Sequence, residues 1–449
     1  MLYNLLKPLG NIFFRIFYKF KYTGLENIPA NKPIVWAPNH TNALIDPVIV
    51  AMTMSHKIRF YARGDVFKGR FVKWAMNSMN MSPMFRLQEG YSEIKKNDKS
   101  FEECRNLLAN NKSILIFPEA ICIQKRRLQP LKKGLSRIVF QTEENFEFKK
   151  DVCVIPVGLN YSNPSKFRSK LFMEIGKPIS IQKYEEQYKQ DKAKAINSFT
   201  KSLEQEMSKL LVIIKNPDND KLVADIEAIF MHQWLKEHRK NEKNIEDQYR
   251  ASKSIADMVN YLDEQNPNLI ESLTTKVLTY TKKLKKYNLR DHLLRPESVN
   301  KMNIGTFILE FLMLWIGMPV YAIGLAMNFP PYYFAKKISL KKTKDIEFFA
   351  SIYSNIAMFL WLIYYPLQLL AVALIFRSWS LLGIYSLLVP LTAGYVLIFY
   401  PMMKKTFGRW RLLRLVRKDR NTVEELISER TAIMEELKIA KKEYLASQN

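Results

Sequence analysis

Cysteine is scarce in this chain of 449 residues, which contains only Cys104, Cys122 and Cys153. None of the three belongs to a CxxC pair, and none shares a metal-ligand spacing with a histidine. This pattern argues against a zinc site and against a framework of disulfides. We therefore predict reduced, structural cysteines, and we predict neither a metal nor a cofactor.

Acidic residues are also in short supply. The chain has 43 Asp and Glu against 69 Lys and Arg, which gives a formal net charge of +26. Such an excess implies an anionic partner, and the candidates are nucleic acid, anionic lipid headgroups and a phosphorylated substrate. We recognise no nucleic-acid motif, and strongly apolar stretches near the C-terminus favour the membrane. The prediction is membrane lipids and no nucleic acid.

Residues 1–22 have the period of an amphipathic helix, with apolar side chains on one face and basic ones largely on the other. This pattern predicts an interfacial helix that lies in the lipid headgroup layer. A cleaved signal peptide is poorly supported, because no basic n-region precedes the apolar run and no A-x-A-like site is present. An ordinary core-packing helix is the other alternative.

The next two regions differ in pattern. Short apolar strands alternate with amphipathic helices over residues 23–182, which predicts an α/β sandwich and places the catalytic domain there. Residues 183–303 are rich in charged and amide side chains with helical periodicity, which predicts a bundle of three to five helices. The predicted strands are 34–37, 58–62, 113–117, 152–157 and 171–175, and the predicted helices of the α/β domain are 66–79, 98–110 and 134–145.

Three apolar stretches make up a membrane-embedded part at 304–403, namely 304–329, 352–376 and 380–400. At about 1.5 Å per residue, each can cross a hydrocarbon layer of about 30 Å. Lysines and arginines follow the first and the last stretch, which predicts cytoplasmic flanks. Residues 352–376 and 380–400 then form a hairpin, and 404–449 form a charged cytoplasmic tail.

With both flanks on one side, residues 304–334 must enter and leave the membrane on the same face. The pairs Met-Pro at 318–319 and Pro-Pro at 330–331 supply helix breaks for such a re-entrant segment. A simple third span is the alternative, and it would put five lysines outside.

The stretch NHTNALIDP at 39–47 follows the apolar strand at 34–37. His40 therefore stands at the end of a strand, with the carboxylate of Asp46 six residues on. A histidine can take a proton from a hydroxyl, while a carboxylate on its other nitrogen fixes the tautomer. Considered alone, such a pair is more often a turn and a helix cap.

Three further segments accompany this pair. NMSPMFR at 80–86 ends in Arg86, whose planar guanidinium can bind phosphate. ILIFPEA at 114–120 places Glu119 after a buried strand and before a basic cluster. The carboxylate can accept hydrogen bonds from a polyol substrate, and the basic cluster beside it can bind an anion. VIPVG at 154–158 is a strand whose proline and glycine allow close backbone approach.

In order and spacing, these four segments resemble the blocks of the glycerolipid acyltransferases of the lysophosphatidate acyltransferase (PlsC-like) family. The resemblance implies a glycerolipid-acyltransferase-type α/β sandwich in which His40 is the general base and Asp46 orients it. It also implies that Arg86 binds the acceptor's phosphate and that Glu119 takes part in acceptor binding. We predict further substrate contacts at Asn39, Arg63, Pro118, Lys132 and Lys133.

Three departures from the family pattern concern the acceptor and the local backbone. Five residues separate His40 from Asp46 where the usual pattern has four, which resembles a variant branch that includes yeast-type glycerol-3-phosphate acyltransferases. Ala120 replaces the glycine of the FPEG block, and Asn80 replaces the glycine that begins the second block.

The resemblance implies a membrane enzyme of phospholipid biosynthesis. Its donor would be acyl-CoA or acyl-carrier protein, and its acceptor the hydroxyl of 1-acylglycerol 3-phosphate (lysophosphatidate). Glycerol 3-phosphate or another lysophospholipid is the alternative acceptor, and an inactive membrane tether is a distant alternative function. The predicted location is a bacterial-type inner membrane with the catalytic domain on the cytoplasmic face.

Overall fold

The computed structural model describes residues 2–85, 97–300, 304–343 and 345–447. They form two compact units. The first unit is the chain up to Ile213, together with Lys243–Tyr249 and Asp345–Ser351, and the second is the remainder.

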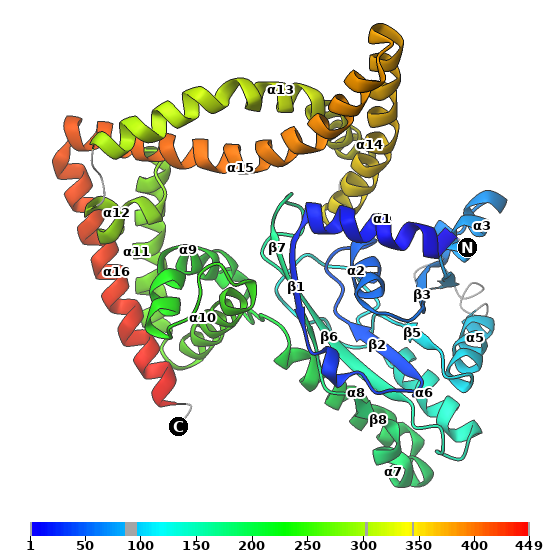
Figure 1. The fold of residues 1–449 in the computed structure, drawn as a ribbon. Coiled ribbons are helices and arrows are strands. Elements are labelled where there is room, and N and C mark those ends of the chain that lie inside the picture. The colour runs from blue at the N-terminus through cyan, green and yellow to red at the C-terminus, as the bar shows by residue number, and fades with distance from the viewer. Residues whose placement is uncertain (1, 86–96, 301–303, 344, 448–449) are drawn as a thin grey trace. The chain divides into compact units, whose positions relative to one another are not determined.

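The first unit is built on an eight-stranded, mostly parallel sheet in the order β1-β7-β6-β2-β5-β3-β4, with β8 paired to β6 (Figure 1). Only the pairs of β6 with β7 and with β8 are antiparallel. Strands β2 to β6 therefore end at one edge of the sheet. The strands are β1 (Lys19–Thr23), β2 (Ile34–Pro38), β3 (Ile58–Arg63), β4 (Met81–Met84), β5 (Ser113–Leu115), β6 (Cys153–Tyr161), β7 (Lys170–Ile175) and β8 (Ile179–Ser180).

The five predicted strands are present, and the structure adds β1, β4 and β8. Sequence patterning missed β1 and β4 because KFKYT is charged and MSPM contains a proline, and both strands lie at the sheet's edges, where such residues are tolerated. The predicted helices at 66–79, 98–110 and 134–145 are found as α3 (Arg70–Ser78), α5 (Asn97–Ala109) and α6 (Gly134–Asn145).

Side chains alternate across the sheet, as a pleated strand requires. Val35 and Ala37 of β2 join a core cluster with residues from α5, α6 and α8 (Lys192–Lys209), whereas Trp36 stacks with His56 instead. Because α8 contributes core residues to the sheet, the first unit extends past the predicted domain boundary at residue 182. The helix α7 (Glu185–Gln190) lies in the same unit.

The N-terminal helix α1 (Leu2–Phe17) is shorter than the predicted 1–22, because residues 19–23 pair with β7 as strand β1. Phe17 is only 2% exposed, so one face of α1 packs into the unit. Ile12 remains 61% exposed, and Leu9 and Ile16 are exposed as well. The helix thus combines core packing with an apolar ridge on its outer side, and its place in a headgroup layer stays a prediction.

The second unit is helical. A buried ion pair between Arg430 of α16 and Asp291, with Nε to Oδ1 at 2.9 Å, ties its C-terminal helix to the segment after α11. One face of α16 is buried, so this part of the predicted charged tail packs against other helices of the unit. The helices are α9 (Asp220–Glu237), α10 (Ile245–Gln265, whose first turn belongs to the first unit), α11 (Pro267–Lys286), α12 (Pro296–Asn300), α13 (Ile304–Lys342), α14 (Ile346–Phe376), α15 (Trp379–Lys418) and α16 (Arg420–Ala446).

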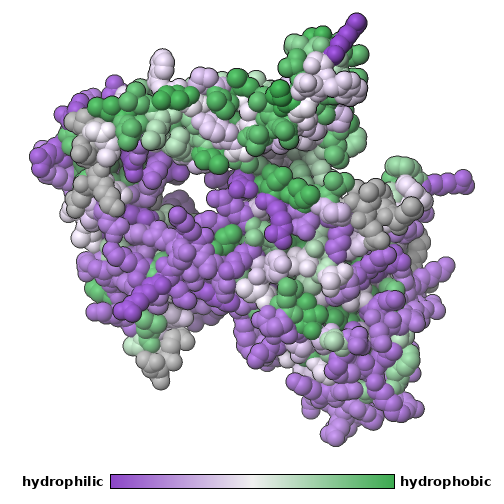
Figure 2. Space-filling model, viewed as in Figure 1, coloured by the Kyte–Doolittle hydropathy of each residue, from purple (hydrophilic) through white to green (hydrophobic). Residues whose placement is uncertain are grey.

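The helices α13, α14 and α15 are each long and apolar enough to cross a membrane, in agreement with the three predicted apolar segments. Figure 2 shows hydrophobic side chains gathered along α13 and α15. These helices make the chain a membrane protein by length and composition.

The predicted helix breaks at 318–319 and 330–331 are wrong, since α13 is one continuous helix through both. Pro331 cannot donate a hydrogen bond to the carbonyl of Met327. The side chain of Gln368 in α14 donates to that carbonyl instead, at 2.9 Å. A neighbouring helix thus satisfies a backbone group that the proline frees, so the helix need not break.

Candidate active site

His40 and Asp46 form a hydrogen-bonded pair beyond the carboxyl end of β2. His40 Nδ1 lies 3.0 Å from Asp46 Oδ2, and the two residues are 9% and 0% exposed. The chain turns after Pro38, and α2 (Ile45–Thr53) brings Asp46 back in its first turn. A five-residue gap can therefore place the two side chains in contact.

The same carboxylate also caps the turn. Asp46 Oδ2 accepts the backbone N–H groups of Thr41 and Asn42 at 2.8 and 2.7 Å, near the start of α2, where a negative charge is favoured. The prediction of a turn is thus confirmed, whereas the cap residue of α2 is Leu44, which makes no side-chain cap hydrogen bond, and the catalytic role of the pair stays a prediction. The two backbone hydrogen bonds hold the carboxylate in the position that the histidine needs.

This network determines how the imidazole is protonated. The carboxylate is an acceptor, so Nδ1 of His40 carries the hydrogen and Nε2 keeps its lone pair. Across the parts of the chain that the structure describes, no group hydrogen-bonds Nε2. The ring stacks on Phe117 with centroids 3.8 Å apart, which limits its rotation. Nε2 is therefore available to accept a proton.

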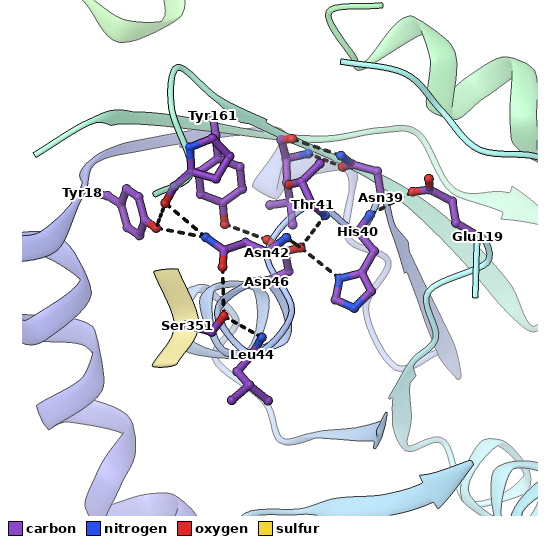
Figure 3. Close-up of polar contacts among 12 residues, drawn as sticks. Tyr18, Asn39, His40, Thr41, Asn42, Leu44, Asp46, Glu119, Tyr161 and Ser351 are labelled. Atoms are coloured by element: carbon purple, nitrogen blue, oxygen red, sulfur yellow. Dashed lines mark hydrogen bonds and ion pairs between the residues drawn. The ribbon is translucent and has the colours of Figure 1, made fainter. Parts of the chain in front are cut away.

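Tyr161 at the end of β6 is a functional candidate that the sequence did not reveal. Its hydroxyl donates to Asp46 Oδ1 at 2.7 Å (Figure 3). Burial raises the pKa of Tyr161 well above its ordinary value, so the phenol stays a donor at neutral pH. The predicted strand stopped at residue 157, where the pairing with β2 ends, and its extension to 161, which pairs with β7, carries the tyrosine to the dyad.

Glu119 holds the backbone of His40 through a hydrogen bond. Its Oε1 accepts the N–H of His40 at 2.8 Å and its Oε2 accepts the N–H of Gln129 at 3.0 Å, and the residue is 3% exposed. Burial raises the pKa of Glu119 to about 7, although the two N–H groups oppose this rise. The contacts make Glu119 a positioning residue, and its part in acceptor binding stays a prediction.

The remaining predicted contacts have different surroundings. Asn39 is buried and hydrogen-bonds the backbone of Leu159 through both ends of its amide, which ties β2 to β6. Pro118 is buried, and its carbonyl accepts the N–H of Lys132 at 2.8 Å.

The predicted cations lie further from the ring. Lys132 and Lys133 have exposed side chains at the start of α6. Arg63, at the carboxyl end of β3, pairs with Asp65 through Nε and Oδ1 at 3.1 Å. Arg86 lies outside the described residues. The structure thus brings together Asn39, His40, Asp46 and Glu119, whereas the substrate contacts of the basic residues stay predictions.

The two departures from glycine keep the backbone shape that glycine would favour. Ala120 has φ of 56° and Asn80 has φ of 66°, both in the left-handed region. Asparagine tolerates this region, and alanine adopts it at a cost of about 1 kcal/mol. The loop after Glu119 therefore keeps its shape without a glycine.

Replacing Glu119 with glutamine should lower turnover about tenfold, because an amide oxygen can accept only one of the two N–H groups that the carboxylate now holds. The initial rate of thioester consumption measures this effect. The surface variant Glu147→Gln is the matched control and should behave as wild type. An unchanged rate in Glu119→Gln would remove Glu119 from the positioning of His40.

The same variant tests the pKa of Glu119. The folded protein keeps a proton on a carboxyl of pKa about 7 that the unfolded chain releases near 4.5. Its contribution to the free energy of unfolding is therefore full below about pH 4.5 and is lost as the pH rises through about 7. Thermal unfolding should show the midpoint difference, wild type minus Glu119→Gln, decreasing between these pH values. A constant difference would show that Glu119 stays ionised throughout.

Comparison with known proteins agrees with this geometry. Residues 19–160 match the family described as Acyltransferase, and residues 238–347 match the family described as Glycerol-3-phosphate acyltransferase 2 C-terminal domain. The chain is 27% identical over 253 residues to glycerol-3-phosphate O-acyltransferase 1 of Saccharomyces cerevisiae, which covers 53% of this chain and 31% of that protein.

Two further proteins are similar to parts of this chain. A 1-acyl-sn-glycerol-3-phosphate acyltransferase of Chlamydomonas reinhardtii is 27% identical over 119 residues, which cover 26% of this chain and 34% of the relative. The crystal structure of the PlsC acyltransferase from Thermotoga maritima is 20% identical, with a TM-score of 0.31, over 45% of this chain and 79% of that one.

The chain spans about a third of the length of the curated relatives it matches. The Acyltransferase match at 19–160 contains His40, Asp46 and Glu119. The two family matches and the geometry of this site thus support an α/β domain of the PlsC-like glycerolipid acyltransferase type in this chain.

Proposed function

We propose that this protein is a membrane O-acyltransferase that moves a fatty acyl group from a thioester donor to a hydroxyl of a glycerol-phosphate acceptor. The observation that carries the proposal is the His40 ring, which is held through Nδ1 by the buried Asp46 and leaves Nε2 open. A base oriented in this way suits the activation of a hydroxyl.

The mechanism needs one base and no covalent enzyme intermediate. His40 Nε2 removes the proton from the acceptor hydroxyl as its oxygen attacks the thioester carbon. Asp46 stabilises the imidazolium, and backbone N–H groups near the strand ends stabilise the oxyanion. The attack forms a tetrahedral intermediate on the substrate. This intermediate then collapses with cleavage of the carbon–sulfur bond, and the leaving thiolate takes the proton back from His40. The products are an ester and a free thiol.

Two acceptors are candidates. The sequence led us to expect lysophosphatidate, whereas the C-terminal family match and two yeast relatives carry the name of glycerol-3-phosphate acyltransferases. The five-residue spacing of the dyad also resembles the branch that includes those enzymes. We therefore place glycerol 3-phosphate first and lysophosphatidate second. The donor is acyl-CoA or acyl-carrier protein.

The basic residues that flank the apolar helices indicate on which side of the membrane these flanks lie. Lys336, Lys337, Lys341 and Lys342 lie in the last turns of α13, and basic residues from Lys404 to Lys418 close α15. Such flanks favour the cytoplasmic side, and we propose that the α/β unit faces the cytoplasm as well. The prediction of a bacterial-type inner membrane is not supported, since the curated relatives named above come from Saccharomyces cerevisiae and Chlamydomonas reinhardtii.

Purified protein in lipid nanodiscs tests the proposal directly. We expect thioester consumption that depends on an acceptor, assayed with glycerol 3-phosphate and lysophosphatidate side by side, each with acyl-CoA and acyl-carrier protein. Faster turnover with glycerol 3-phosphate would support the first acceptor. Faster turnover with lysophosphatidate would make it the preferred acceptor. No turnover in any of the four combinations would refute the proposed acyltransferase activity.

A further inference from the structure

The first turns of a membrane-type helix belong to the α/β unit. Residues Asp345–Ser351 cluster with the sheet, although the helix that they begin, α14, continues as an apolar segment. Two contacts fasten this segment near its start. Gln124 Nε2 donates to the carbonyl of Ile346 at 3.0 Å, and the guanidinium of Arg63 lies 6.0 Å from the centre of the Phe348 ring.

A third contact reaches the turn between His40 and Asp46. The hydroxyl of Ser351 donates to Asn42 Oδ1 at 2.9 Å and accepts the backbone N–H of Leu44 at 3.0 Å (Figure 3). Ser351 and Asn42 are both 0% exposed, so water does not compete for these bonds. One serine therefore holds both a side chain and a backbone group of the same turn.

Asn42 passes this restraint to the dyad. Its backbone N–H donates to Asp46 Oδ2 at 2.7 Å, the oxygen that also contacts His40. Its side-chain amide donates to the hydroxyl of Tyr18 at 3.0 Å, which holds the residue from the opposite end. The chain of contacts from Ser351 through Asn42 to Asp46 is continuous and buried.

We propose that Ser351 is a positioning residue of the acyltransferase site, through which the membrane helix α14 sets the geometry of the dyad. The proposal rests on the proposed function for its kinetic consequence only. The segment 39–44 has no regular secondary structure, so side-chain contacts must hold it in place. A serine on a helix that continues into an apolar segment links the conformation of this turn to the insertion of that helix.

Ser351→Ala tests the proposal, because alanine removes the hydroxyl without adding volume. We expect kcat to fall about tenfold, with KM for either substrate changed less than twofold, as for the loss of two neutral hydrogen bonds at a positioning residue. Ser351→Thr keeps the hydroxyl and should recover most of the rate. The matched control is Ser339→Ala in α13, an equally buried serine that, among the described residues, bonds to Ala335 of its own helix.

A double-mutant cycle with Asn42→Ala shows whether Ser351 acts through Asn42. Relative to Asn42→Ala alone, the double variant should lose clearly less than the tenfold of Ser351→Ala, since the bond to Asn42 is already gone and only the bond to the N–H of Leu44 remains to be lost. A wild-type kcat in Ser351→Ala, equal losses in Ser351→Ala and Ser339→Ala, or fully multiplicative losses in the cycle would each overturn the proposal.

Hydrogen–deuterium exchange tests the same contact without a substrate. In the full-length protein in nanodiscs, the peptide that covers 39–46 should exchange about tenfold faster in Ser351→Ala than in wild type or Ser339→Ala. Unchanged exchange would overturn the contact even if the enzyme is active. Faster exchange in a protein without thioester turnover would refute the proposed function and leave the positioning contact in place.

Discussion

Replacing His40 with alanine is expected to lower turnover by about a thousandfold or more, which is the range of a positioned general base. Beside the buried carboxylate, the variant loses the ring nitrogen that accepts no hydrogen bond from the residues that the structure describes. Binding of the protein to membranes should not change, because α13, α14 and α15 are untouched. Thioester consumption in nanodiscs and a flotation assay measure the two properties separately.

The matched control is His238→Ala. His238 stacks on Trp234 and bonds the carbonyl of that residue through Nδ1 at 2.7 Å, far along the chain from the dyad. We expect turnover within twofold of wild type in this variant. Activity retained in His40→Ala, or lost equally in both variants, would remove the dyad from the mechanism.

Asp46→Asn should have the second largest effect, a loss of about a hundredfold to ten-thousandfold in kcat. Asp46 accepts four hydrogen bonds, from His40, Thr41, Asn42 and Tyr161. An asparagine has one acceptor oxygen and one donor nitrogen, so it cannot satisfy these donors together. If the amide nitrogen faces His40, Nδ1 must become the acceptor, and Nε2 then carries the hydrogen and cannot act as a base.

Two variants separate this effect from a general loss of structure. Tyr161→Phe removes one of the four hydrogen bonds and leaves the carboxylate, so we expect about a tenfold loss. Asp225→Asn changes a carboxylate that pairs with Lys221 along α9, and it should have no effect. Circular dichroism of each variant reports whether the fold is intact. A fully active, folded Asp46→Asn protein would refute the assigned tautomer.

The turn between β2 and α2 has two functions that depend on one carboxylate. The charge that caps this turn, by accepting the N–H groups of Thr41 and Asn42, is the same charge that orients the imidazole. Because the cap is local, the dyad forms wherever the turn folds correctly. The wider shell of Tyr161, Glu119 and Ser351 then decides how rigidly it is held.

Sequence patterns predicted the dyad because its members are six residues apart and follow a recognisable apolar strand. Glu119 was found for the same reason, since a buried strand ends just before it. Tyr161 and Ser351 carry no such signal. The first lies beyond the predicted end of its strand, and the second lies in an apolar helix 309 positions from Asn42, where a serine has no evident task until the fold is known.

The prolines of α13 illustrate a different failure. Proline removes a backbone donor, and local rules therefore predicted helix breaks. The helix continues because Gln368, from another helix, donates to the carbonyl that Pro331 leaves free. Local rules describe the hydrogen bond that a proline removes from its own helix. Whether another group replaces that bond depends on residues that are close in space.

The sequence by itself determined the alternation of strands and helices, the three apolar helices, and the His40–Asp46 pair, because these depend on periodicity and on short separations along the chain. Only the tertiary structure decided which residues hold that pair, because β6, the loop after β5 and the start of α14 meet it from distant parts of the chain. Such meetings are set by the packing of the sheet and its helices, and packing is a property of the whole fold.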